Sequence, residues 1–510
     1  MQRNPYLPTA ELTSTFRLDL AVLCAIALAK LLLHAWTNGA YGFHRDELPM
    51  LDDAQNLAWG FVAYPPVTPA IARLALGLFG PSLSGLRFFA AAAQSMAMVF
   101  AALIARDLGG RRFAQTVTAV GVAISPISWA ASTMFQYVTF DFLWWVLLAW
   151  MVVRLIRTDN ARWWLAIGAV IGVGMLTKYT MGFYALGIAA GTLLTPMRRH
   201  LRSPWLWAGA ALSILIFLPN LRWQMQHDFI SLEFLKSIHA RDVRIGRTDS
   251  FLLDQFRVAA NPATIPLWIS GLWFFLLSER GRRFRMIGWM AVIPLVLFIL
   301  AKGRGYYTGP LFPMLIAGGS LCLERWLDAG SRMRPRWMQT AAWSLLAAGA
   351  AIALLIGPYA PVNSRWWSVA SALNSDLMEE IGWPDLTRTV AGIYRRLSPQ
   401  ERANTGIFAG NYGEAGALHL YGPAWGLPHA ISGTNSYWLR GYGEAPQNLI
   451  LVGSDIEDAR QAFQQCAVVG RITNSYGIKN EESTKHPDVL FCRGLKLPWP
   501  ELWPKAKNFG

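Results

Sequence analysis

The sequence predicts an α-helical protein that crosses a membrane many times and carries a small α/β domain outside it. Three observations support this prediction. Of the 510 residues, 54% are hydrophobic and only 15% are charged, whereas soluble domains carry about 25% charged residues. The apolar residues fall in blocks of roughly 17–22, the length needed to cross a hydrocarbon core about 30 Å thick. After residue 358 these blocks stop, and shorter patterns follow.

About eleven spans are expected from block length and hydropathy. They run approximately over residues 17–36, 86–105, 113–131, 137–156, 162–178, 180–196, 204–221, 263–278, 286–301, 307–325 and 338–358. The first span follows a polar segment and is long enough to stay in the membrane rather than be removed as a signal sequence. Many of the 24 Trp residues lie near block ends, as in interfacial aromatic belts.

Basic residues follow every second span, for example Arg111 and Arg112 after the second. By the positive-inside rule these loops are cytoplasmic. In a bacterial inner membrane this orientation predicts a cytoplasmic N-terminus (1–16), a transmembrane domain (17–358) with a long outer first loop (37–85), and a periplasmic C-terminal domain (359–510). The net charge of +15 sits in short loops, with no continuous basic face, so nucleic acid is not an expected partner.

Two regions outside the spans have patterns of their own. The first outer loop holds two amphipathic stretches, near 46–58 and 66–79, which predict short helices on the membrane surface. In the C-terminal domain, residues 449–452 predict a buried strand and 456–464 a helix. An oxidising compartment would permit a disulfide between Cys466 and Cys492, although spacing alone does not establish one.

The first outer loop opens with two adjacent acids, Asp46 and Glu47. Next to apolar surface a carboxylate is partly desolvated, which raises its pKa and improves it as a proton acceptor. The pair therefore suits a general base that acts on an acceptor hydroxyl. A solvated helix N-terminus explains the same two residues about equally well, because acids favour that end of the helix dipole.

Asp141 stands inside an apolar run near the outer end of the fourth span. An acid there costs about 2.5–3.5 kcal/mol on insertion scales, so it usually has a partner or a task; an interface or capping residue is the other explanation. Cations and hydroxyls on the same side suit a lipid-borne phosphate: Lys178, Lys302, Arg304, Tyr306 and Tyr307. Ordinary snorkelling explains Lys178 and Lys302 about as well.

Soluble-enzyme signatures do not stand out in the sequence. It has no P-loop, no Gly-x-Ser-x-Gly and no His/Cys cluster with metal-ligand spacing. A carboxylate pair can bind a divalent cation, but two acids do not specify one. No metal ligand and no certain cofactor is therefore assigned.

The arrangement resembles the C-type glycosyltransferases, in particular the family 39 branch that contains protein O-mannosyltransferases and lipid A aminoarabinose transferases. The resemblance covers roughly residues 15–325. The segments that carry it are Phe43–Glu47, Trp59–Pro66, Leu83–Phe88, Phe140-Asp141, Thr177–Tyr179, Arg304–Tyr307 and Pro310–Pro313. Looser matches are Gly410–Ala415 and Ser432–Trp438. The sequence Ala63–Pro66 departs from relatives that have a His, or a Glu-Lys, before the prolines.

The resemblance implies transfer of a sugar from a polyprenyl-phosphate donor to an acceptor on the outer face. Asp46 would be the general base, with Glu47 beside it and Asp141 as the second acid. The cations and tyrosines named above would contact the donor phosphate. His44 and Tyr64 would contact substrate from the first loop.

The sugar and the acceptor stay open: a hexose, pentose or aminopentose, and a glycolipid such as lipid A, another envelope glycan or a protein. Modification of lipopolysaccharide is the favoured setting. A transporter or flippase of a lipid-linked sugar is the main alternative, although that class places its charges near the bilayer midplane. A scaffold that binds glycolipid without catalysis is a further alternative.

Overall fold

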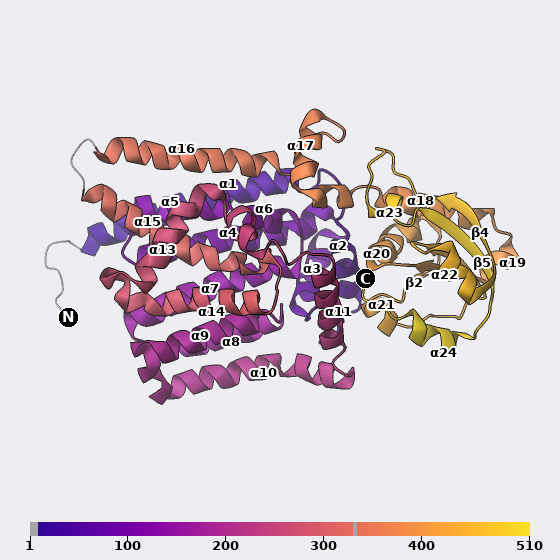
Figure 1. Ribbon diagram of the computed structural model, residues 1–510, viewed down its shortest axis with the longest axis horizontal. Helices are drawn as coiled ribbons and strands as arrows, with labels where there is room; N and C mark the ends of the chain where they lie inside the picture. The colour runs from indigo at the N-terminus through magenta and orange to yellow at the C-terminus, as the bar shows by residue number, and fades with distance from the viewer. Residues whose placement is uncertain (1–8, 330–333) are drawn as a thin grey trace.

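A computed structural model describes residues 9–329 and 334–510. It shows a long helical bundle with a compact α/β domain at one end (Figure 1). The first helix begins at the opposite end of the bundle from this domain, and the last residues of the chain lie where the domain meets the bundle.

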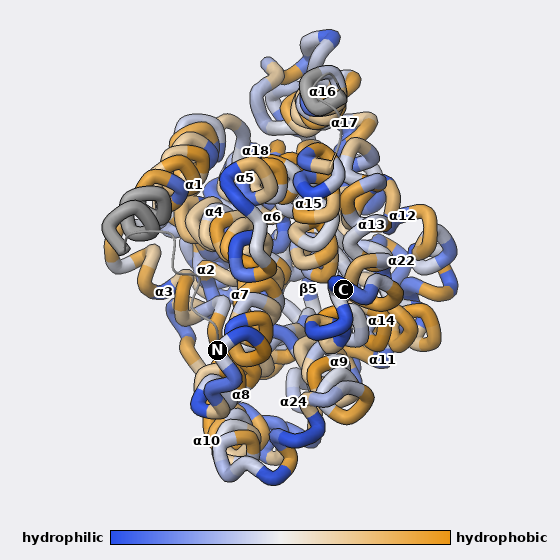
Figure 2. The backbone as a smooth tube through the Cα atoms, turned by 90° about the vertical axis from the view of Figure 1, so that its left-hand side faces the viewer, coloured by the Kyte–Doolittle hydropathy of each residue, from blue (hydrophilic) through white to orange (hydrophobic). Residues whose placement is uncertain are grey.

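The bundle is formed by helices that run side by side along its length (Figure 1). They are α1 (Thr9–Thr37), α4 (Leu83–Asp107), α5 (Arg112–Ala123), α6 (Pro126–Thr133), α7 (Tyr137–Thr158), α8 (Trp163–Met175), α9 (Met181–Leu194), α10 (Pro204–Gln226), α13 (Ile265–Leu276), α14 (Arg285–Leu300), α15 (Phe312–Asp328) and α16 (Arg334–Leu355). Viewed from the end far from the domain, these helices are largely orange, and blue stretches mark many connections between them (Figure 2).

The protein is a multi-pass membrane protein, but the count of eleven spans is not confirmed. In the described residues, six helices are long and apolar enough to cross a membrane, or seven if α5 and α6, bent by 61°, form one span. Three predicted spans correspond to shorter apolar helices: Trp163–Met175, Met181–Leu194 and Pro262–Leu276. At 1.5 Å per residue each is only about 20 Å long, less than the hydrocarbon thickness of about 30 Å.

Small residues explain how the central helices pack closely. The face of α4 that meets its neighbours carries Ala90, Ala97 and Ala101, none of them exposed to solvent. At its outer end the same helix holds Arg87, whose side chain is fully buried. A buried cation needs a partner, and Arg87 is where the bundle meets the outer segments.

The outer segments lie between the bundle and the α/β domain (Figure 1). The two helices predicted in the first outer loop are present as α2 (Glu47–Gln55) and α3 (Val67–Phe79). Two more, α11 (Ile230–Arg244) and α12 (Phe251–Arg257), follow the long helix α10. A 3₁₀ turn, η4 (Gly305–Leu311), precedes α15.

The α/β domain is built on a five-stranded sheet of order β2-β1-β3-β5-β4. Its strands are β1 (Thr405–Ala409), β2 (Ala430–Ile431), β3 (Asn448–Val452), β4 (Phe463–Arg471) and β5 (Asp488–Leu495). Strand β1 is parallel to β2 and β3, whereas β5 is antiparallel to β3 and β4. Cys466 and Cys492 are cross-strand neighbours and form a disulfide.

Helices pack around this sheet: α18 (Trp383–Arg396), α19 (Pro399–Ala403), α20 (Tyr412–Tyr421), α21 (Ser436–Leu439), α22 (Ile456–Ala462), α23 (Glu481–Thr484) and α24 (Trp499–Leu502). The helix α17 (Arg365–Leu373) lies apart from the sheet, beside the end of α16 (Figure 1). The predicted strand and helix are present as β3 and α22, the latter ending where β4 begins. The predicted fold class, a helical membrane bundle with a small C-terminal α/β domain, is confirmed.

Candidate active site

Asp46 lies at the junction of the bundle, the first outer loop and the α/β domain. It is the N-cap of α2 and is partly exposed. The amide of Gln136, just before α7, donates a hydrogen bond to one carboxylate oxygen. The hydroxyl of Tyr412, at the start of α20, donates to the other over 2.8 Å. The carboxylate therefore has two neutral donors and no ion-pair partner among the described residues.

The loop before α2 fixes the backbone at Asp46. The Asp46 amide donates to Nδ1 of His44 over 3.1 Å, and the His44 amide donates to the Glu47 carboxylate over 2.8 Å. His44 is only 6% exposed. It therefore shapes the turn that presents Asp46, and its expected contact with substrate stays a prediction.

Glu47 is adjacent in sequence but faces the protein interior. Its side chain is fully buried and forms two charge-assisted hydrogen bonds with Arg87, over 2.7 and 2.8 Å. It also accepts from the Phe135 amide. Arg87 contacts Glu380 as well, over 3.3 Å. With its side chain buried against Arg87, Glu47 has a structural contact in this arrangement, and its expected role beside Asp46 stays a prediction.

Lys178 lies in the turn between α8 and α9 and is only 8% exposed. Its ammonium is 3.9 Å from the ring centre of Tyr307 and 5.6 and 5.8 Å from those of Tyr137 and Tyr306. In the described part of the chain it forms no ion pair within 4 Å. A buried cation bounded by aromatic faces without a contacting carboxylate is ready to receive an anion.

Arg304 lies beside the same tyrosines. Its guanidinium bonds Asp242 of α11 over 2.6 Å and reaches the Tyr306 hydroxyl over 3.4 Å. Lys302, by contrast, is exposed, and its side chain forms no hydrogen bond or ion pair with the described residues. The structure brings Arg304, Tyr306 and Tyr307 to Lys178 and leaves Lys302 outside the group.

Asp141 is 2% exposed on the inner side of this group. Its oxygens accept hydrogen bonds from Nε1 of Trp145 over 2.9 Å and from the Thr180 hydroxyl over 3.1 Å. It also attracts Lys178 at longer range. Asp141 stands five residues beyond Gln136, about 7.5 Å along the helix, so it and Asp46 flank one region.

Tyr64 belongs to a second polar group next to this one. Its ring centre is 5.7 Å from that of Tyr137, and its hydroxyl donates to Asp53 over 2.6 Å. Burial raises the pKa of Asp53 to about 7, against the opposing charge of Arg440, which pairs with both Asp52 and Asp53. The Tyr64 hydroxyl is thus bonded to Asp53, and the Tyr64 ring packs against Tyr137 beside the candidate site.

The residues that hold Asp46 were not found by sequence reasoning. Gln136 lies in a short turn and Tyr137 opens the predicted span 137–156, and neither stands out in the sequence. Tyr412 falls within the loosely matching segment Gly410–Ala415. That match marked the segment as similar to the family but indicated no role for Tyr412. Among the described residues no three His, Cys, Asp or Glu side chains come together in a way that could hold a metal ion.

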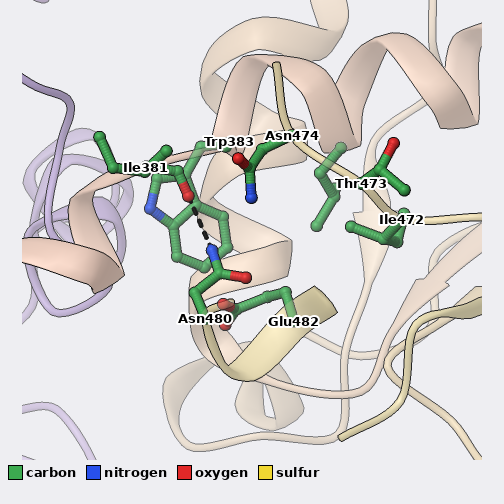
Figure 3. A pocket seen from close by; sticks show the side chains of 9 residues that line it. Ile381, Trp383, Ile472, Thr473, Asn474, Asn480 and Glu482 are labelled. Carbon is green, nitrogen blue, oxygen red and sulfur yellow. Dashed lines mark hydrogen bonds between the residues drawn. The ribbon is translucent and has the colours of Figure 1, made fainter. Parts of the chain in front are cut away.

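Two cavities lie away from this group. One, of about 450 Å³, runs between α5, α13, α15 and α16 within the bundle. The other, about 10 Å³, is inside the α/β domain, where Glu482, Asn480 and Trp383 line it (Figure 3). The dashed line in Figure 3 marks the hydrogen bond from the Asn480 amide to the Ile381 carbonyl, 2.7 Å long.

Comparison with known proteins points to membrane glycosyltransferases. Residues 63–223 match the dolichyl-phosphate-mannose-protein mannosyltransferase family. A lipid A galacturonosyltransferase, RgtD from Rhizobium johnstonii, is 28% identical over 272 residues, which are 51% of this chain and 55% of that protein. The chain thus spans about half the length of this curated relative.

Solved structures extend the similarity to nearly the whole chain. ArnT from Cupriavidus metallidurans, in a crystal structure with undecaprenyl phosphate, aligns over 92% of this chain and 97% of its own, with a TM-score of 0.54 and 15% identity. The oligosaccharyltransferase of Archaeoglobus fulgidus aligns over 86% of this chain and 69% of its own, with a TM-score of 0.51 and 14% identity. The resemblance inferred from the motifs is confirmed at the level of fold: the chain has the C-type glycosyltransferase fold of these structures, and about half of it is similar in sequence to a lipid A galacturonosyltransferase.

Proposed function

We propose that the protein transfers a sugar from a polyprenyl-phosphate carrier to an acceptor in lipopolysaccharide, with lipid A as the first acceptor to test. The observation that carries the proposal is the pairing of two groups. A partly exposed carboxylate, Asp46, and a buried ammonium, Lys178, both lack an ion-pair partner among the described residues, and both act on Tyr137. The ammonium is 5.6 Å from the centre of the Tyr137 ring, and the charge of Asp46 reaches the Tyr137 hydroxyl. A base and an anion site side by side are what glycosyl transfer from a lipid phosphate needs.

The reaction divides between these two groups. The acceptor hydroxyl attacks the anomeric carbon of the donor sugar and gives its proton to Asp46. The bond from that carbon to the phosphate oxygen breaks, and the lipid phosphate departs with the electron pair. Lys178 and Arg304 lie where they would stabilise its charge, with Tyr306 and Tyr307 as hydroxyl donors. Because the phosphate is already a good leaving group, no general acid is required.

The remaining acids position these groups. Asp141 is buried and attracts Lys178, so it would hold the cation in place. Glu47 would anchor α2 through Arg87. Lys302, which is exposed and apart, has no part in this scheme. No step is assigned to a divalent cation.

The charged loops support an orientation. At the end of the bundle far from the α/β domain, basic residues of separate loops meet: Arg157 pairs with Asp107 over 2.5 Å, and Arg283 donates to the Ile156 carbonyl over 2.9 Å. Short basic loops favour the cytoplasm. We therefore place this end and the N-terminus in the cytoplasm, and Asp46 and residues 359–510 in the periplasm, with the bundle in the inner membrane.

The choice of acceptor rests on the relatives. RgtD is a lipid A galacturonosyltransferase, and ArnT binds undecaprenyl phosphate. The donor sugar is not specified by the described contacts. A hexose, a hexuronic acid, a pentose and an aminopentose are therefore all to be offered to the enzyme.

The test is mass spectrometry of lipid A and core glycan from a deletion strain. Loss of one sugar unit, restored by the wild-type gene but not by Asp46→Asn at equal protein level, is the expected result. The purified protein in nanodiscs should then transfer that sugar from its polyprenyl phosphate. Unchanged glycolipids with lipid-linked sugar accumulating on the cytoplasmic side would instead identify a flippase.

A further inference from the structure

The α/β domain reaches the candidate active site through one side chain. Tyr412 opens α20 and donates its hydroxyl to Asp46 over 2.8 Å, although the two residues are 366 positions apart. Among the described residues, two side chains donate hydrogen bonds to the Asp46 carboxylate. Tyr412 belongs to the α/β domain, and Gln136 belongs to the bundle.

The start of α20 is built to bring Tyr412 to this place. Asn411 caps the helix, and Glu414 reaches back to the Asn411 amide, which completes a capping box. Helix α20 then lies directly against the start of α2. A side chain at Gly413 would meet Arg45 at 2.4 Å, and one at Gly416 would meet Leu48 at 2.7 Å. Only glycine permits this approach.

An ion-pair group holds the same junction from the side. Arg45 pairs with Glu481 over 2.7 Å and with Glu379 over 3.2 Å, so it joins the first outer loop to two segments of the domain. Tyr412 therefore cannot swing away from Asp46 without disturbing close helix packing and these pairs. The contact is fixed by its surroundings.

We propose that Tyr412 is a positioning residue of the glycosyl transfer, so that the C-terminal domain completes the active site. The inference rests on the proposed role of Asp46 as base. Tyr412 and Gln136 each occupy one oxygen of the carboxylate, which fixes the direction in which its free lone pairs point. Because both donors are neutral, they orient the carboxylate without forming a salt bridge, which would make Asp46 a weaker proton acceptor.

One property of Tyr412 suits this task. Burial and the nearby charge of Asp46 raise the pKa of Tyr412 above its usual value, so the hydroxyl keeps its proton and remains a donor. The titratable and charged groups that face this pair from the surrounding elements are His44 and Arg45 of the first loop, Tyr137 of α7, Arg241 of α11 and Arg304 before η4.

The experiment compares pH profiles of transfer for the wild type, Tyr412→Phe, Gln136→Leu and the control Tyr421→Phe. Tyr421 lies on the same helix, and its hydroxyl has no hydrogen bond among the described residues. Loss of one donor to a charged group should raise the acid limb of kcat/KM by about one pH unit. It should also lower kcat roughly tenfold, with KM for the donor little changed. Tyr421→Phe should match the wild type.

A second measurement does not depend on activity. Thermal unfolding of Asp46→Ala, Tyr412→Phe and the double variant forms a double-mutant cycle. The losses should be non-additive, since either change removes the same contact.

The outcomes separate the two proposals. If the wild type transfers sugar and Tyr412→Phe has an unshifted profile, or if the losses in Tm are additive, the role of Tyr412 is wrong while the proposed function stands. If the wild type transfers no sugar from any polyprenyl phosphate but the cycle is non-additive, the contact is real and the proposed function is wrong.

Discussion

Asp46 and Glu47 are neighbours in the chain, yet they belong to two regions with different physical chemistry. Asp46 is partly exposed and is held by an amide and a hydroxyl. Glu47 is fully buried and is paired with Arg87, which also contacts Glu380. Burial raises the pKa of Glu380 to about 7, against the attraction of Arg87.

The difference suggests a different role for each carboxylate, proton transfer for Asp46 and structural support for Glu47. A carboxylate that is fully ion-paired and buried is a poor base, because it gives up a strong interaction when it takes a proton. A carboxylate held by neutral donors keeps its geometry and can still accept one. The pairing of Glu47 with Arg87 holds α2 against the bundle. Asp46, at the start of the same helix, is thereby held in a fixed position.

The first way to sharpen this comparison is to neutralise Asp46. Asp46→Asn should lower kcat by about 10²–10⁴-fold, the usual contribution of a positioned general base. Its melting temperature should stay within about 2 °C of the wild type, since an amide oxygen can still accept from Tyr412. Steady-state transfer and thermal unfolding in detergent measure the two effects. A variant with near-normal kcat would remove Asp46 as the base.

Neutralising Glu47 should reverse the pattern. Glu47→Gln leaves Arg87, whose side chain is fully buried, without its strongest ion pair. Breaking a buried pair costs about 3–5 kcal/mol, so the variant should accumulate poorly and unfold at a lower temperature. Whatever folds should retain a substantial fraction of kcat. Normal stability with lost activity would instead return Glu47 to the catalytic group.

The two lysines offer a matched pair for the phosphate site. Lys178 is buried among three tyrosine rings, whereas Lys302 is exposed and has no side-chain partner among the described residues. Lys178→Met should lower kcat/KM by about 10²-fold, the effect of losing a charge that stabilises the leaving group. Lys302→Met should change it less than about twofold. Equal effects would contradict the assignment of Lys178.

Glu482 represents a third kind of carboxylate, buried with no hydrogen-bond partner for either oxygen among the described residues (Figure 3). Burial raises the pKa of Glu482 to about 7, with Arg45 opposing. Since this native pKa lies above the unfolded value, the protonated form is favoured by folding. Its contribution is fully present below about pH 4.5 and is lost as the pH rises through about 7.

Glu482→Gln should therefore match the wild type in stability at pH 5 and exceed it at pH 8. The gain at pH 8 should be on the order of 1–3 kcal/mol, measured by thermal unfolding across pH. Glu457→Gln on the exposed face of α22 is the control, with no such pH dependence expected. A constant difference at both pH values would show that Glu482 is ionised throughout.

The smallest effect is expected from metal removal. Asp46 is held by an amide and a hydroxyl, and no three potential metal ligands gather in the described part of the chain. Transfer after treatment with a chelator should stay within about twofold of the untreated rate. A large loss that Mg²⁺ or Mn²⁺ restores would place a cation in the mechanism.

The sequence predicted the features that depend on local patterns and missed those that depend on residues far apart in the chain. The outer helices α2 and α3, the strand β3 and the fold class follow from local patterns of hydropathy and from prolines. The count of eleven spans is not confirmed, because apolar helices such as α8 and α9, of 13 and 14 residues, read like spans in sequence although they are short. Hydropathy reports composition, whereas crossing a membrane depends on length.

The site was predictable in part for the same reason. Asp46 and Lys178 were visible as charges next to apolar runs. The opposite environments of Asp46 and Glu47 were not, because they are decided by Arg87, Gln136 and Tyr412, none of which is close in sequence. Neutral donors such as Gln136 carry no local signature at all.

The long separation between Asp46 and Tyr412 has a consequence for the order of biogenesis. Asp46 is synthesised early, in the loop before α2, and its hydroxyl partner Tyr412 follows 366 residues later. Segment 507–510 then closes the junction, with Lys507 on Glu233 and Arg241 on the Gly510 carbonyl. A partly synthesised chain would lack the hydrogen bond from Tyr412 to Asp46, so under the proposed function sugar transfer would begin only after the α/β domain has folded and docked against the bundle.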